Sequence, residues 1–118
     1  MSQFPLITES SWPPSSCTLP TVEQPLRMKE FDDLCAAAGL TVERINAVIA
    51  RLRLRAESAI AAKATELAVR ETGCCSFFAF TLSVTRGELY LDIEVPDAHV
   101  AVLDALTERA ELAIPAAT

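Results

Sequence analysis

The segment from residue 75 to residue 95 constrains the fold most, because its pattern is typical of a β-hairpin. Residues 75–84 are rich in phenylalanine, threonine and valine, and residues 89–95 alternate between apolar and polar side chains. The turn between them is Thr85-Arg86-Gly87-Glu88, and such a turn between two strand-like runs predicts a hairpin. The second strand is therefore expected to bury one face and expose the other, with Leu89, Leu91, Ile93 and Val95 on the first and Tyr90, Asp92 and Glu94 on the second.

Helical patterns lie on both sides of this hairpin. A helix is expected to begin near Glu23 and to stop at Gly39, and Cys35 on it is predicted to be a small buried core residue. A second helix is expected over residues 57–72, with Gly73 ending it in a left-handed turn. A third is expected to open at Pro96-Asp97, where Asp97 caps the free amides.

The segment from Thr41 to Arg55 is ambiguous, because its apolar residues fit both a helical and a strand spacing. We expect a loop or short helix that becomes a strand near Val48. The order helix, strand, helix, strand, strand, helix then predicts an α+β fold: a small, mostly antiparallel three-stranded sheet with helices packed on one face. Such a sheet leaves its edges exposed, which favours a homodimer formed at a strand edge.

Length and composition limit the classes of function. A chain of 118 residues is expected to form one domain, with residues 1–16 as a flexible N-terminal arm and residues 17–118 as a single α+β domain. The net charge of −6 argues against a nucleic-acid partner. No apolar run approaches the ~18 residues of a membrane span, and the N-terminus lacks the pattern of a secretory signal. We therefore expect no membrane partner and a cytoplasmic location.

The adjacent pair Cys74–Cys75 is the strongest chemical signal, since it stands where a helix pattern meets an aromatic strand. In a reducing compartment, cysteines more often serve as thiols or metal ligands than as disulfides. Thiolates select soft metals, and a third thiol, Cys17, lies in the N-terminal segment. We therefore predict a metal site formed by Cys17, Cys74 and Cys75. Three thiolates suit As(III), and two opposed thiolates suit Hg(II).

Other chemistries stay open. Structural zinc is disfavoured, because the chain has no Cys-x-x-Cys motif and its one histidine, His99, is expected on the surface. A disulfide from Cys17 to either member of the pair would give a redox protein. A thiol-dependent enzyme such as an organomercurial lyase would need an acid nearby, and Glu71, Asp92 and Glu94 are candidates, although such carboxylates more often form a solvated face. In a further alternative, the chain is a dimerising structural module whose cysteines are incidental.

Two stretches of the chain carry a more specific pattern: Cys17-Thr18-Leu19-Pro20-Thr21 followed by Glu23-Gln24-Pro25-Leu26-Arg27, and Glu71-x-x-Cys74-Cys75-x-Phe77-Phe78-x-Phe80. They resemble a family of small bacterial proteins with a Cys-Cys-x-Phe-Phe segment. A similar segment accompanies some metal-responsive regulators of the mercury-resistance type. The resemblance spans most of residues 17–110 and implies association with heavy metals through the three motif cysteines. The chain has no helix-turn-helix segment and so is not a complete DNA-binding regulator. We expect a cytosolic module that sequesters or senses Hg(II), As(III) or Cu(I).

Overall fold

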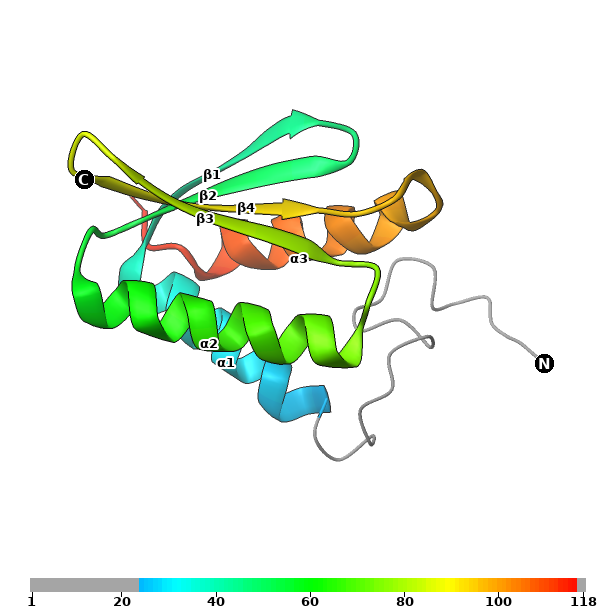
Figure 1. The fold of residues 1–118 in the computed structure, drawn as a ribbon, viewed down its shortest axis with the longest axis horizontal. Helices are drawn as coiled ribbons and strands as arrows, with labels where there is room; N and C mark the ends of the chain where they lie inside the picture. The colour runs from blue at the N-terminus through cyan, green and yellow to red at the C-terminus, as the bar shows by residue number, and fades with distance from the viewer. Residues whose placement is uncertain (1–23, 117–118) are drawn as a thin grey trace.

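The computed structural model describes residues 24–116, except for the side chains of residues 24–27 and of Cys74. The predicted arm at residues 1–16 and Cys17 lie outside this range. In chain order (Figure 1) the elements are α1 (Gln24–Ala38), β1 (Gly39–Asn46), β2 (Ile49–Leu54), α2 (Ser58–Cys74), β3 (Ala79–Thr85), β4 (Glu88–Glu94), the short 3-10 helix η2 (Asp97–His99) and α3 (Val100–Ala113).

The described residues form one antiparallel sheet of four strands in the order β1-β2-β4-β3. The fold is therefore α+β as expected, but the expectation of three strands was wrong. The additional strand is β1, which lies in the ambiguous segment and is joined to β2 by the two-residue turn Ala47-Val48. Its pairing with β2 is interrupted near each end, so its apolar residues do not alternate as those of a regular strand do.

The hairpin of β3 and β4 confirms the strongest sequence pattern. Arg86 and Gly87 form its turn, and both have a positive φ, of 54° and 77°. Two successive residues in this conformation match the twist of the flanking strands, which is why two-residue hairpin turns favour it. Strand β3 begins at Ala79 rather than at Cys75, because Cys75–Phe78 connects the end of α2 to the sheet.

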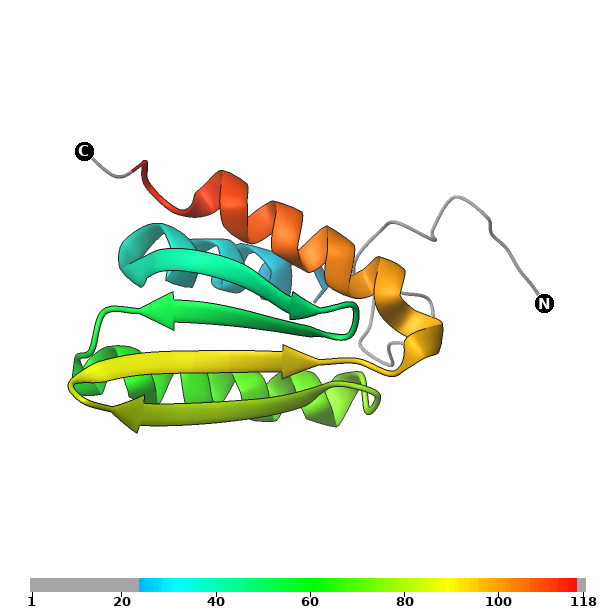
Figure 2. The same ribbon diagram turned by 90° about the horizontal axis from the view of Figure 1, so that it is seen from above.

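All three described helices cover the same face of the sheet, as predicted (Figure 2). Helix α3 lies along β1, whereas α2 lies beneath β3 and β4. Alternate residues of the two central strands point into the core between sheet and helices: Ala50, Leu52 and Leu54 from β2, and Leu89, Leu91 and Ile93 from β4. The expected burial of one face of residues 89–95 is therefore confirmed.

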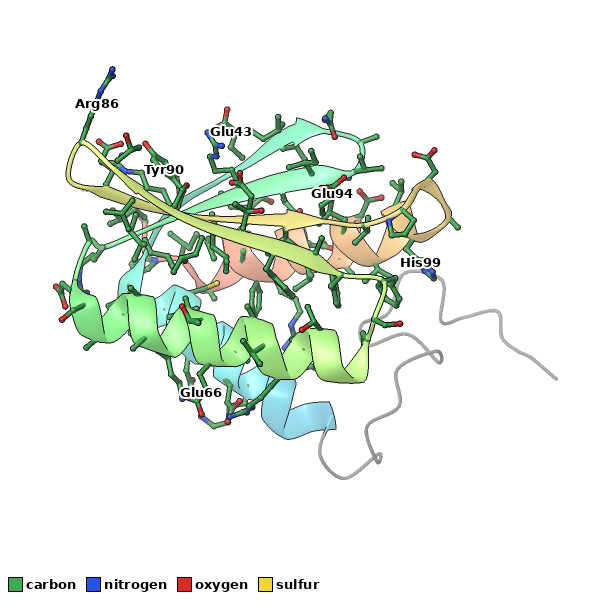
Figure 3. All side chains as sticks on the ribbon, viewed as in Figure 1. Glu43, Glu66, Arg86, Tyr90, Glu94 and His99 are labelled. Carbon is green, nitrogen blue, oxygen red and sulfur yellow. The ribbon has the colours of Figure 1, made fainter. Side chains whose placement is uncertain are left out.

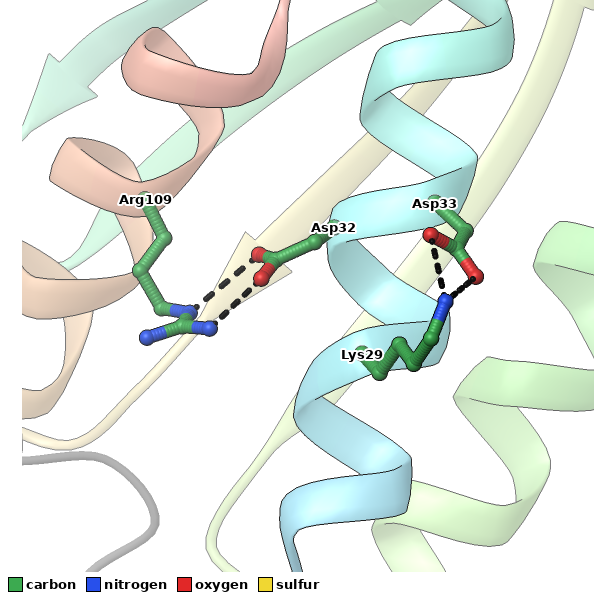
Figure 4. Close-up of polar contacts among 4 residues, drawn as sticks. All are labelled: Lys29, Asp32, Asp33 and Arg109. Atoms are coloured by element: carbon green, nitrogen blue, oxygen red, sulfur yellow. Dashed lines mark hydrogen bonds and ion pairs between the residues drawn. The ribbon is translucent and has the colours of Figure 1, made fainter.

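Ion pairs link α1 to both of its neighbours. Arg109 of α3 donates to the carboxylate of Asp32 at 2.6 and 3.3 Å (Figure 4), and Arg70 of α2 pairs with Glu30. Both pairs are partly exposed, so each contributes about 1 kcal/mol or less. The apolar residues Phe31 and Leu34, together with Cys35, supply the buried face of α1.

The last helix begins differently from the prediction. Asp97 makes no side-chain capping bond, and a short 3-10 turn precedes α3, with the His99 amide donating to Pro96 O at 2.9 Å. This turn gives the His99 amide, immediately before α3, a backbone acceptor in place of a side-chain cap. Within residues 24–116, no helix combines the length and the apolar character needed to cross a bilayer.

Candidate functional site

The cysteine pair lies at the C-terminal end of α2, but Gly73 does not end that helix as expected. The helix runs through Gly73 to Cys74, and Cys75 follows in an extended conformation with φ −121° and ψ 91°. Gly73 does not have a positive φ. The helix ends instead where the chain turns into the core, with the Cys75 amide donating to Glu71 O at 2.7 Å.

Cys75 is enclosed. Its residue is 1% exposed and belongs to the hydrophobic core cluster. A tight turn holds it from the other side, because the Phe78 amide donates to Cys75 O at 3.2 Å.

The other two predicted ligands are not described in the same detail. The backbone of Cys74 forms the last residue of α2, but its side chain lies outside the described part, as does all of Cys17. The convergence of the three sulfurs therefore stays a prediction. Among the side chains of residues 28–116 that are described, no group of three or more His, Cys, Asp or Glu residues is arranged to hold a metal ion.

Glu71 lies one helical turn before Cys75 and is buried, with 5% exposure. It was expected on a solvated face, but it lines a small cavity of about 20 Å³ with Leu67 of its own helix and Phe78 and Phe80 beyond it. The core packs a carboxyl group and a thiol close together along the chain at this end of α2. The helical periodicity of the sequence could have predicted the burial of Glu71, because residues 60, 64, 67 and 71 share one helical face.

Asp92 and Glu94, the other two candidate acids, lie on the opposite face of the sheet. Figure 3 shows Tyr90 and Glu94 there, on the side away from the helices. Asp92 accepts two bonds from Arg51, at 2.8 and 3.0 Å. Cys75 belongs to the core on the helical face, so the sheet separates it from Asp92.

His99 is closer to the cysteine segment than its sequence position indicates. Its ring stacks on Phe77 with 4.0 Å between the ring centroids, and Phe77 in turn contacts Phe78 at 4.8 Å. The aromatic contacts continue from Phe78 to Phe80 at 5.4 Å. The segment that follows Cys75 is therefore anchored on η2. No pattern in the sequence pairs Phe77 with His99, because 22 positions separate them.

Cys35 is confirmed as a core residue, with 0% exposure on α1. Burial raises the pKa of its thiol to about 12, and the negative charge of Asp32 adds to this effect. A thiol with such a pKa is protonated at neutral pH and is a poor metal ligand and nucleophile.

Comparison with protein-family models, with curated proteins and with solved structures finds no match to this chain.

Proposed function

We propose that the chain binds a soft metal or metalloid ion, Hg(II), As(III) or Cu(I), through Cys74 and Cys75, with Cys17 as a third donor. The observation that carries the proposal is the position of the vicinal pair at the C-terminal end of a 17-residue helix. The last turn of α2 contains no basic residue, so its carbonyl groups keep their partial negative charge. That charge favours a cation by about 0.3–1 kcal/mol.

The backbone at the pair supports the same proposal. Neighbouring side chains in a regular strand point to opposite faces and cannot easily hold one ion. Cys74 is helical and Cys75 is extended, so this alternation does not apply to them.

The burial of Cys75 bears on which ions fit. Its surroundings are apolar, and a strongly hydrated ion such as Mg²⁺ gives up its water reluctantly. A soft ion gains a strong bond to sulfur in return for its water. The surroundings therefore favour soft ions over hard ones, for sequestration or for sensing.

The test is a titration of the reduced protein with Hg(II), followed by the absorbance of the thiolate-to-metal bond. We expect saturation at a fixed stoichiometry, and we expect Cys74→Ser together with Cys75→Ser to remove most of the signal. Cys17→Ser should weaken binding and change the coordination number. Cys35→Ala is the matched control and should bind like the parent. Equally tight binding by the double variant would exclude this function.

An organomercurial lyase is the second candidate, and the burial of Glu71 beside Cys75 is the feature that favours it. In such a reaction the carbon–mercury bond breaks, the acid transfers its proton to carbon, and mercury stays on the thiolates. Turnover of an organomercurial with added thiol should then be lost in Glu71→Gln and kept in Asp92→Asn. Capture of one equivalent without a hydrocarbon product would exclude turnover and leave binding.

A further inference from the structure

Strand β3 is an edge of the sheet that the described residues form. It pairs with β4 through an unbroken register, and its sequence, Ala79–Thr85, contains no charged residue, proline or glycine. Val84 at its end is 68% exposed. Natural sheets usually protect such an edge, because its unpaired amides and carbonyls can pair with another chain.

The opposite edge, β1, is protected. It carries Glu43 and Arg44, and its pairing with β2 is irregular at two places. Arg44 is bound to Asp104 of α3 at 2.7 Å. Charges and bulges are the devices by which sheets prevent pairing at an edge. The two edges therefore differ, and within residues 24–116 β3 is the edge that lacks these devices.

The flank of α2 below this edge is also uncharged. Arg70 points to α1, where it pairs with Glu30, so the flank turned away from α1 is the one that carries Ala61, Thr65, Ala68 and Thr72 at helical spacing. The Thr65 hydroxyl donates to Ala61 O at 2.8 Å, and that of Thr72 donates to Val69 O at 2.9 Å. Both hydroxyls are thus satisfied within the helix.

The helix flank and the strand edge adjoin each other. Ala61 and Val84 line one groove of about 160 Å³, which places the small residues of α2 next to the end of β3. Glu57 also lines this groove, and its carboxylate pairs with Arg55 at 3.0 Å. The edge and the flank therefore form a surface with no unpaired acidic group from the described residues of the groove, on a chain whose net charge is −6.

We propose that this surface binds a second copy of the chain, with the two β3 strands paired antiparallel about a twofold axis at Leu82. Thr81 then lies opposite the partner's Ser83, and Phe80 lies opposite the partner's Val84. The exposed valine is covered, and the two sheets join into one. Because β3 carries no charged side chain, two acidic copies meet at this edge without placing like charges directly opposite each other.

The helices fit the same arrangement. Helix α2 lies beneath β3 and β4 (Figure 2). In the twofold dimer, the axis of α2 and that of the partner's α2 are therefore about two strand spacings apart, or about 10 Å. Packed helices are about 8–10 Å apart, and small side chains allow the shorter distances. The alanines and threonines of the flank meet this requirement.

The test compares oligomeric state by sedimentation equilibrium. The parent should be a dimer. Thr81→Lys with Ser83→Lys should be a monomer, and so should Thr81→Glu with Ser83→Glu, because each places like charges opposite each other across the axis. An equimolar mixture of these two variants should form a heterodimer. Thr41→Lys with Glu43→Lys, on the open face of β1, is the matched control and should stay dimeric.

Recovery in the mixture separates a lost contact from a lost fold, and circular dichroism of each variant checks the fold directly. A monomeric parent, dimeric lysine or glutamate variants, or a mixture that stays monomeric while both variants are folded would each overturn the proposal. Since no cysteine is changed, the result is independent of metal binding.

Discussion

The imidazole of His99 lies nearly parallel to the phenyl ring of Phe77, with 12° between the two planes. This contact joins the segment that follows Cys75 to η2, immediately before α3. Removing it is therefore expected to loosen the segment next to the buried thiol before it unfolds the sheet.

The first prediction concerns Phe77→Ala. The loss of a half-buried aromatic ring should lower the free energy of unfolding by about 2 kcal/mol. Alkylation of Cys75, located by mass spectrometry, should become faster than in the parent. Val69→Ala, which removes an exposed side chain from α2, is the control and should leave the alkylation rate unchanged. An unchanged rate in Phe77→Ala would show that the aromatic stack does not hold the segment closed.

The second prediction follows from the helical position of Gly73. A methyl group added there would meet no atom within 4 Å, and alanine is favoured over glycine inside a helix by about 1 kcal/mol. Gly73→Ala should therefore raise the melting temperature. A left-handed conformation at this position would produce the opposite result. Gly39→Ala provides the contrast, because its added carbon would lie 2.6 Å from Cys35 O, and it should be destabilising.

The third prediction uses Tyr90, the single tyrosine of the chain. Its hydroxyl donates to the Glu88 carboxylate, and this hydrogen bond raises the pKa of Tyr90 above its ordinary value. Tyrosinate absorbance should therefore appear at higher pH than for a model tyrosine. Glu88→Gln should lower the pKa of Tyr90 towards the ordinary value, whereas Glu94→Gln, farther along the same strand, should not change it.

The fourth prediction concerns alkaline pH. The pKa of Cys35 is about 12 in the folded chain, against an ordinary value of 9.0. Between these values the unfolded chain loses the proton and the folded chain keeps it, so stability falls as pH rises. We expect a loss of about 1 kcal/mol between about pH 8 and about pH 10 from this thiol.

Urea denaturation of the parent and of Cys35→Ala at both pH values isolates the contribution of the thiol. The raised pKa of Tyr90 also makes stability fall with rising pH, but it does so in both the parent and the variant. Its contribution therefore cancels when the two proteins are compared. Equal pH dependence of the two proteins would contradict the raised pKa of Cys35.

The sequence predicted secondary structure and burial most accurately where one hydrophobic periodicity dominates. Leu89, Leu91 and Ile93 alternate with polar residues and are buried, because a strand at the centre of a sheet covered on one face must present one apolar side. Strand β1 was not predicted, because an edge strand buries fewer of its side chains and because its register shifts break the alternation of apolar and polar residues. Helix α2 was predicted to begin one residue too early and to end two residues too early. The end was misplaced because helix propensity disfavours Gly73, whereas burial of Cys75 in the core keeps the chain helical through Cys74.

The site was harder to predict than the fold. The position of the cysteine pair at a joint between helix and strand was recognised, but the burial of Cys75 and Glu71 depends on how residues 75–78 turn into the core. That turn is fixed by tertiary contacts such as Phe77 with His99, which have no counterpart in local pattern. The convergence of Cys17 with the pair stays a prediction.

The enclosure of Cys75 has a kinetic consequence. For the ion binding proposed above, entry to and exit from this buried sulfur require a local opening of the core, and the rate of that opening would limit capture at high ion concentration. Exchange of the ion with small thiols in solution would be slow even where the equilibrium favours it. Under the proposed function, such slow exchange would suit storage of an ion better than its rapid transfer.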